Sequence, residues 1–445
     1  MTSDLMNSLG GFADWVRTHH AHAGHRVHLL RQAQRLLEQG GGERPARLDL
    51  ADRLERWRYQ HLHEVEGRPS DADRRLIDGL DGLGRRVAGL RRRPPRATCE
   101  AVDSEGAAEA LDRIERWLGP EAPLGPLTDT ARRLTAEHFV DRRTGRRRML
   151  LYAPLYLSSH CVNYCVYCGF RYPNRIQRRH LDRRAALQQT DILARRGFGR
   201  ILLVAGDFPA LTTTEYFREI IEALRQRDLE AAVEIAPQSA GGYARLAEAG
   251  ACGVTLYQET YDRELYALYH PQGSKADYHW RLEGLDRAGE SGIPRLGLGV
   301  LLGLAEPWGE LRAMVRHAQY LNDRFPTHRL AFSLPRIHQA PPGFETPYPV
   351  GDETLLRMYC ALRIAFPRAE LVLSTREPPE LRDRLARECI TQFSAGSRTA
   401  PGGYSQACTR QGGEQFPVSD RRTPAEVADW LRAAGFEVTW RAHTS

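Results

Sequence analysis

Residues 149–170 read MLLYAPLYLSSHCVNYCVYCGF, and at this stretch the character of the sequence changes. It begins with an apolar run, 149–157, that has the length and composition of a buried β-strand. It ends in a loop that carries three of the eight cysteines of the chain, Cys161, Cys165 and Cys168. Further apolar runs follow, and segments with the helical spacing of apolar residues separate them.

Together with 149–157, the later runs make eight candidate strands. These runs are 200–206, 231–237, 253–259, 295–304, 329–335, 369–375 and 389–396. Eight strand-then-helix units over roughly 250 residues predict an α/β fold of the (β/α)8 TIM-type barrel, in which catalytic groups lie at the C-terminal ends of the strands. An open, doubly wound parallel sheet is the alternative.

The composition predicts a soluble globular protein. Apolar residues make up 42% of the 445 residues, and no apolar run is long enough to span a membrane. The first residues show no basic segment followed by an apolar one, so we expect no secretory signal and a cytoplasmic location, where thiols stay reduced. The net charge of +7 comes from 63 basic and 56 acidic residues spread along the chain, and it predicts no nucleic-acid partner.

Residues 1–98 are predicted to form an α-helical N-terminal extension, and 99–445 a catalytic barrel with a C-terminal closing segment. Helices are expected over 11–39 and 48–67, before the Pro94–Pro95 linker, and a further helix over 105–119. The first 63 residues contain seven of the sixteen histidines, which are His19, His20, His22, His25, His28, His61 and His63. A metal-binding helical bundle is one interpretation, and a solvated hairpin on which a pathway partner docks is the favoured one.

The three cysteines follow the first predicted strand with the spacing C-x3-C-x2-C. Three thiolates on one loop can hold three irons of a 4Fe–4S cluster and leave one open iron without a protein ligand. A structural zinc site with His160 as the fourth ligand is the alternative.

The cysteine spacing, with an aromatic residue just before the last cysteine, resembles that of the radical S-adenosylmethionine (SAM) superfamily. The resemblance implies that SAM binds the open iron and is cleaved reductively to methionine and a 5′-deoxyadenosyl radical. It also implies an electron donor such as flavodoxin or ferredoxin, and it places Tyr167 beside the adenine of SAM.

Further motifs narrow the resemblance to the aromatic amino-acid lyases of this superfamily, which include 2-iminoacetate synthase and the tyrosine lyase of FeFe-hydrogenase maturation. The motifs are LYQETY (256–261), HPQGSKADYHW (270–280), GLGVLLGL (297–304), SLPR (333–336), LSTREPPELRD (373–383) and SAGSRTAPGGY (394–404). The resemblance implies hydrogen abstraction from the amino group of L-tyrosine and Cα–Cβ cleavage to 2-iminoacetate and p-cresol.

The resemblance assigns cofactor roles at two strand ends. Gly206 and Asp207 stand where the family has Gly-Glu, so Asp207 is expected to receive the amino group of SAM, with a carboxylate one methylene shorter. Gln258 and Glu259 are expected at the ribose hydroxyls of SAM. Ordinary structural roles for both pairs are the alternative.

By the same resemblance Arg336 holds the substrate carboxylate, with Ser333 nearby, and His270 lies near the substrate phenol. A planar guanidinium suits this task because it grips a carboxylate through two parallel bonds. Lys275 is the single lysine among 63 basic residues, which indicates a task that arginine cannot perform; it either orders its loop or contacts a ligand. Arg376 and Glu377 either line the cavity or form a structural pair.

Several functional alternatives stay open. The C-terminal part has no C-x2-C pair for a second cluster, so thiamine thiazole biosynthesis is favoured over a hydrogenase-maturase role. The segment at His270 favours tyrosine over tryptophan as substrate. A cluster-binding scaffold without turnover is the alternative of another class.

Overall fold

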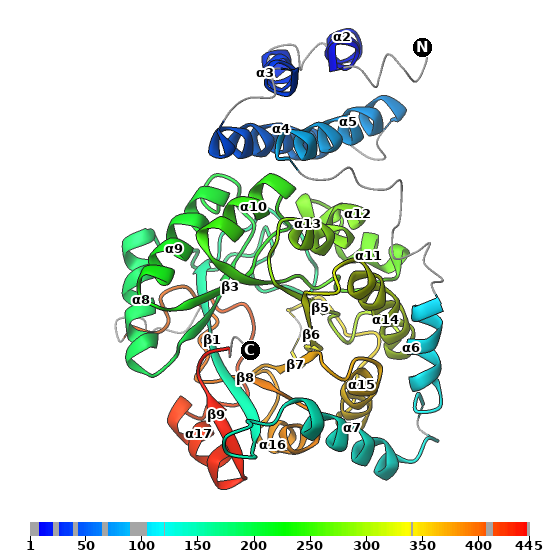
Figure 1. The fold of residues 1–445 in the computed structure, drawn as a ribbon, viewed down its shortest axis with the longest axis vertical. Helices are drawn as coiled ribbons and strands as arrows, with labels where there is room; N and C mark the ends of the chain where they lie inside the picture. Colours follow the sequence, from blue (N-terminus) through cyan, green and yellow to red (C-terminus); the bar gives the residue numbers. More distant parts are fainter. Residues whose placement is uncertain are drawn as a thin grey trace. The chain divides into compact units, whose positions relative to one another are not determined.

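The computed structural model describes residues 9–20, 26–38, 43–64, 70–89, 105–119, 121–339, 341–405 and 413–442 (Figure 1). The chain forms two compact units. The helical unit comprises Met1–Arg96, Gln238–Glu248 and Asp286–Gly292, and the barrel unit comprises Ala97–Pro237, Ala249–Leu285 and Ile293–Ser445. The predicted Pro94–Pro95 linker lies outside the described residues.

The predicted closed barrel is confirmed (Figure 1). All eight predicted strands are present and parallel: β1 (Arg147–Ser158), β2 (Arg200–Ala205), β3 (Glu230–Glu234), β4 (Ala251–Thr255), β5 (Arg295–Gly299), β6 (Arg329–Ser333), β7 (Glu370–Leu373) and β8 (Gln392–Ser394). The sheet closes because β1 pairs with β2 on one side and with β8 on the other. The open-sheet alternative is therefore excluded.

β1 is the longest of these strands and pairs with three partners along its length. The N-terminal part of β1, Arg147 to Leu150, also pairs in parallel with β9 (Phe436–Thr439), a strand that the sequence did not predict. From Met149 onward every residue of β1 is buried, as is every residue of β5. Strands covered on both faces read as continuous apolar runs, which explains why the run at 149–157 was recognisable.

After the segment Met1–Arg96, two helices precede β1 and the others follow the strands along the chain. They are α6 (Glu105–Glu115), α7 (Leu124–His138), α8 (Arg183–Arg195), α9 (Thr214–Gln226), α10 (Ala240–Ala249), α11 (Arg263–Tyr269), η2 (Ser274–Ala276), α12 (Tyr278–Leu282), α13 (Gly284–Glu290), α14 (Pro307–Arg324), α15 (Asp352–Ala365), α16 (Pro379–Glu388) and α17 (Pro424–Ala433). Among the described residues, no helix is both long enough and apolar enough to cross a bilayer.

One carboxylate joins four neighbouring strands inside the barrel. Glu370 at the start of β7 binds Arg295 of β5 and Arg329 of β6, and it accepts a hydrogen bond from Gln392 of β8. Burial alone would raise the pKa of the Glu370 carboxyl, but Arg295, Arg200 and Arg329 outweigh burial and lower this pKa to about 2.

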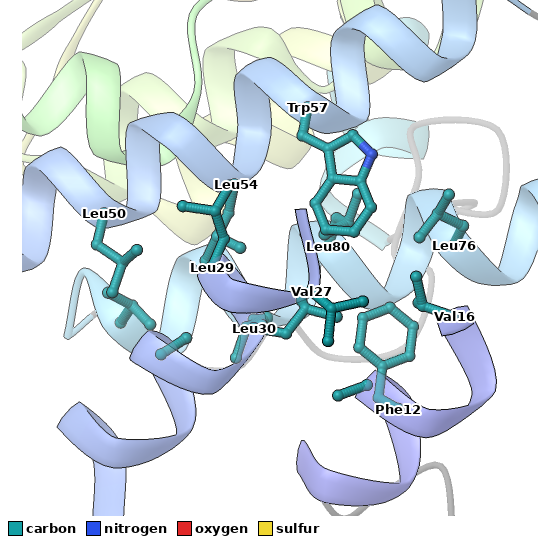
Figure 2. Packing of buried hydrophobic residues seen from close by; sticks show 14 of the residues in the cluster. Phe12, Val16, Val27, Leu29, Leu30, Leu50, Leu54, Trp57, Leu76 and Leu80 are labelled. Atoms are coloured by element: carbon teal, nitrogen blue, oxygen red, sulfur yellow. The ribbon is translucent and has the colours of Figure 1, made fainter. Parts of the chain in front are cut away.

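The helical unit contains α2 (Leu9–His19), α3 (Val27–Glu38), α4 (Arg44–Glu64) and α5 (Asp71–Val87). Figure 2 shows its apolar core, in which Phe12, Leu30, Leu54 and Leu80 pack together. A Cβ atom on Gly79 would lie 2.3 Å from the Phe12 ring, so glycine lets the ring lie against α5.

The single helix predicted over 11–39 is wrong, because the structure has two helices, α2 and α3, in this range. Helical geometry ends at His19, and the next described helix begins at Val27. The sequence between them contains Gly24, a residue type of low helix propensity. His22 and His25, which the sequence placed on one helical face with His28, lie outside the described residues.

Replacing Glu370 by glutamine should lower the free energy of unfolding at pH 7 by about 3 kcal/mol or more, because Arg295 loses its buried partner. The folded-state pKa of Glu370 lies below the unfolded value of 4.5, so its contribution is present above pH 4.5 and is lost as the pH falls toward 2. Denaturant unfolding of wild type and Glu370→Gln should differ equally from pH 8 to 5 and converge below. Glu353→Gln, which changes an exposed partner of Arg357, is the control; an equal effect of both changes would contradict this account.

Candidate active site

The three cysteines lie in the loop that follows β1, at the C-terminal end of the barrel strands. The end of β2 holds this loop, because the Gly206 N–H donates to the Ser158 carbonyl at 2.9 Å and the Val162 N–H donates to the Asp207 carbonyl at 2.8 Å. A Cβ atom on Gly206 would lie 2.3 Å from the His160 carbonyl oxygen. Glycine at this position therefore lets β2 approach the cysteine loop closely.

The sulfur positions fit a cluster better than a single ion. Three thiolates on one tetrahedral zinc lie about 3.8 Å apart. Among the described residues, one set of three potential ligand atoms lies within 4.8 Å of one another, and it contains no cysteine. Burial first, and the neighbouring thiols in addition, raise the pKa of both Cys161 and Cys165, so the three thiols form one electrostatic group. This arrangement suits three corners of a 4Fe–4S cube and disfavours the zinc alternative.

The side chain of Asp207 binds the loop. Its Oδ2 atom accepts hydrogen bonds from the Asn163 amide, at 3.1 Å, and from the Ser274 hydroxyl. The Asn163 carbonyl oxygen in turn accepts from the Lys275 N–H at 2.8 Å. Asp207 thus joins the cysteine loop to the segment at 273–277, and its contact with SAM stays a prediction.

A cavity of about 390 Å³ opens beside the last cysteine of the loop. Three cations and three carboxylates line it, together with aromatic side chains. The charged residues are Lys275, Arg336, Arg376, Glu234, Glu259 and Glu414. Tyr167 and Cys168 also lie in the wall, so the predicted cluster corner faces a space large enough for a small ligand.

Glu259, in the segment that follows β4, has a left-handed backbone conformation, with φ of 72°. Its Oε1 atom lies 2.5 Å from the Lys275 ammonium and 3.2 Å from the Arg281 guanidinium. Burial would raise the pKa of the Glu259 carboxyl, but Lys275 and then Arg281 outweigh burial and lower it. The neighbouring Gln258 is buried, and its Nε2 atom has no hydrogen-bond partner within the described part of the chain.

Tyr167 is held by His270. The Tyr167 hydroxyl lies 2.7 Å from His270 Nε2, and His270 Nδ1 lies 2.8 Å from the Tyr266 carbonyl. Burial first, and then Lys275, lower the pKa of His270 well below its ordinary value, so the ring is neutral. A carbonyl only accepts, so Nδ1 carries the proton and Nε2 accepts from Tyr167. His270 is 1% exposed and does not line the cavity, so the geometry places it behind Tyr167.

Arg336 closes β6 and lines the cavity, but much of its guanidinium is engaged. Its Nε and Nη2 atoms donate to the two oxygens of Glu377, and its Nη1 atom donates to the Val350 carbonyl at 2.8 Å. Glu377 therefore pairs with Arg336, and the structural pair of Arg376 with Glu377 that was one alternative is not among the ion pairs of the described residues. Arg376 lines the cavity and forms no ion pair with any described carboxylate; its guanidinium lies over the Phe416 ring.

Ser333, expected near the substrate, lies deeper in the barrel. It lines a smaller internal cavity with Tyr257 and hydrogen-bonds to the hydroxyl of Tyr257. Tyr257 also hydrogen-bonds to Glu234 and lines the larger cavity. Tyr257 therefore connects Ser333 to the candidate site.

Two residues at the site were not predicted. Glu234 ends β3, and burial raises the pKa of its carboxyl to about 7, although Arg376 opposes the shift. A single carboxylate in the apolar run AAVEIAP was the available signal. Gln415, from the C-terminal segment, donates from Nε2 to the Cys168 sulfur at 3.8 Å and accepts from the Tyr156 hydroxyl at 2.9 Å. No local pattern marks Gln415.

Two family models match the chain. The radical SAM superfamily matches residues 155–318, and the Biotin and Thiamin Synthesis associated domain matches residues 333–437. The chain is 36% identical over 348 residues to 2-iminoacetate synthase of Salmonella typhimurium, and 37% identical over 348 residues to that of Escherichia coli. Each comparison covers 77% of this chain and 90% of the relative.

Solved structures of two other proteins share the fold of this chain. The FeFe-hydrogenase maturase HydG from Carboxydothermus hydrogenoformans superposes with a TM-score of 0.68 and 30% identity, over 90% of this chain and 86% of that chain. Methylornithine synthase superposes with a TM-score of 0.58 and 19% identity, over 77% of this chain and 96% of that chain, which shows a shared fold.

Replacing Gly206 by alanine should displace the cysteine loop, because the added methyl meets the His160 carbonyl and the Cys161 side chain. We expect the iron content after anaerobic reconstitution to fall severalfold. Gly125→Ala in α7, where an added Cβ has no neighbour within 4 Å, is the matched control and should keep wild-type iron. Iron and sulfide per chain measure the effect, and full occupancy in Gly206→Ala would show that this close approach does not position the ligands.

Proposed function

The chain belongs to the 2-iminoacetate synthase family of the radical SAM superfamily, and on this premise we propose that it cleaves the Cα–Cβ bond of L-tyrosine. The products are 2-iminoacetate and p-cresol. One observation carries the proposal: a loop of three cysteines, on a chain that covers 90% of its curated relatives, opens onto a cavity lined by cations and carboxylates. When bound, the cluster and SAM supply the radical that begins the reaction.

Cys161, Cys165 and Cys168 are the ligands that we assign to three irons. The carboxylate of Asp207 fixes the loop through its hydrogen bond with Asn163, and so acts on the site by positioning the cysteines. Gln415 also supports the loop, through its contact with the Cys168 sulfur. The ordering of these groups before any ligand enters keeps the geometry fixed during the reaction.

Glu259 and Gln258 form the ribose-binding pair in this proposal. Glu259 stays anionic because Lys275 and Arg281 lower its pKa, and an anionic carboxylate accepts from two hydroxyls. The Gln258 amide is buried and has no described partner for Nε2, so a ligand acceptor satisfies it. Tyr167, held by His270, forms the aromatic wall beside the adenine.

Two guanidinium groups receive the substrate carboxylate. Arg376 contributes a cation that no described carboxylate pairs. The Arg336 guanidinium binds Glu377, Asp352 and the Val350 carbonyl, so one N–H of its Nη1 atom is left for the substrate. Arg376 supplies positive charge for the substrate carboxylate, because the charge of Arg336 is already shared with Glu377. Glu234, with a pKa of about 7, takes a proton from the substrate ammonium, so that a neutral amine faces the radical.

One of the family models supports a pathway for the product. A Biotin and Thiamin Synthesis associated domain at 333–437 supports thiamine thiazole formation as the use of 2-iminoacetate. The likeness to HydG keeps a maturase-type tyrosine lyase as the second candidate. Flavodoxin or ferredoxin is the electron donor that we infer, in the reducing cytoplasm where free thiols persist.

Anaerobically reconstituted protein, given SAM, reductant and L-tyrosine, should form 5′-deoxyadenosine, p-cresol and glyoxylate, the hydrolysis product of 2-iminoacetate. Tryptophan should yield no 3-methyl-2-indolic acid. Arg376→Met should raise the KM for tyrosine about tenfold or more, since a charge-assisted contact to the carboxylate is lost. Absence of 5′-deoxyadenosine would indicate a non-catalytic scaffold, and 5′-deoxyadenosine without p-cresol would refute tyrosine as substrate.

Replacing Lys275 by methionine should raise the pKa of Glu259, because the carboxylate loses its strongest cationic neighbour. The site needs the anion, so activity that rises with pH should begin at a higher pH in the variant. Lys275→Arg keeps the charge and should keep this limb of the profile, with a lower kcat. The measurement is the rate of SAM cleavage from pH 4 to 8, and an unchanged acidic limb in Lys275→Met would contradict the role given to Glu259.

A further inference from the structure

The helical unit contains a group of metal-ligating side chains that the proposed function does not use. His20 follows α2, His61 lies in α4, and Asp73 lies in the first turn of α5. One potential ligand atom from each lies within 4.8 Å of the other two, the one such set among the described residues. The segments matched by the two family models, 155–318 and 333–437, do not include these residues.

We propose that His20, His61 and Asp73 bind a divalent transition-metal ion, with zinc as the reference ion. Two imidazole nitrogens and one carboxylate oxygen are ligands that zinc and iron(II) both accept, with further positions left for water. Two helices, α4 and α5, supply one ligand each, and the residue that follows α2 supplies the third; metal sites inside helical bundles are likewise built from side chains of different helices.

The distances are close to those that an ion requires. Ligand atoms on a tetrahedral zinc lie about 3.4 Å apart. His61 Nε2 lies 2.8 Å from Asp73 Oδ1, so these two atoms need to separate by a few tenths of an ångström to admit an ion. The His20 and His61 rings meet edge to face, with centroids 5.1 Å apart. No helix needs to be rebuilt.

Neighbouring groups orient the ligands. Asp73 belongs to the capping box of α5, in which its Oδ2 atom accepts from the Ser70 N–H at 2.9 Å and from the Ser70 hydroxyl at 2.5 Å. The other oxygen, Oδ1, is thereby directed at His61. The Trp15 ring packs against His20, with centroids 5.4 Å apart. Such contacts fix the orientation of metal ligands.

Burial distinguishes this group from a chance cluster of surface histidines. Both His20 and His61 are 3% exposed. A cation between two buried imidazole nitrogens and the Asp73 carboxylate is attractive to all three. The plain alternative is a His61–Asp73 hydrogen bond, with His20 as packing; in that case removing His20 changes no metal binding.

The test uses the full-length protein with its cluster reconstituted, so that the cysteine loop is occupied. After equilibrium dialysis against micromolar zinc, wild type should hold one zinc per chain in addition to its iron. His20→Gln and Asp73→Asn should each weaken zinc binding about tenfold or more. His28→Ala, an exposed histidine of α3, is the matched control and should bind as wild type does.

A second measurement guards against variants that fail to fold. Zinc should raise the melting temperature of wild type and His28→Ala, but not that of His20→Gln or Asp73→Asn. Circular dichroism checks that each variant retains its helices. No zinc on wild type, or equal binding by wild type and by folded His20→Gln, would overturn the proposal. Neither result would affect tyrosine cleavage, so this site and the proposed activity are tested separately.

Discussion

The site depends on one constraint: β1 is hydrogen-bonded on both sides. Its pairing with β2 and β8 closes the barrel and fixes where the chain leaves the sheet after Ser158. The first of the three cysteines, Cys161, lies three residues after the end of β1, so the pairing of β1 with its neighbours determines where the cysteine loop begins. Gly206, at the end of the neighbouring strand, has no side chain to separate its backbone from that of His160. A sheet open at this edge would leave the loop supported on one side alone.

The charged groups of the cavity are arranged mostly in compensating ion pairs. Glu259 is balanced by Lys275 and Arg281, and Arg336 by Glu377, so most of the buried charge is compensated before a ligand enters. The remaining imbalance lies at Arg376 and Glu234. Buried charges that stay uncompensated are costly, and such positions are where anionic or cationic ligand groups bind most favourably. The location of this imbalance indicates where the substrate carboxylate and amino group lie.

The sequence predicted the strands well because buried parallel strands produce continuous apolar runs, and it located the cysteine loop because the spacing is local. It could not predict which distant side chains meet. The pairing of Arg336 with Glu377 joins residues 41 positions apart, and the position of His270 behind Tyr167 depends on how two loops pack. The strand β9 was missed because only Phe436 of its four residues is buried. In the helical unit, the meeting of His20, His61 and Asp73 arises from three helices whose mutual packing no periodicity reveals.

The contact between Gln415 and Cys168 connects the C-terminal segment to the cysteine loop. An N–H group directed at a cluster thiolate withdraws electron density from the sulfur and favours the reduced state. Under the proposed assignment of Cys168 as an iron ligand, this hydrogen bond from the C-terminal segment would favour the entry of an electron. Tyr156, on β1, fixes the same amide from its oxygen side, so the barrel wall and the C-terminal segment both orient the group that contacts this sulfur.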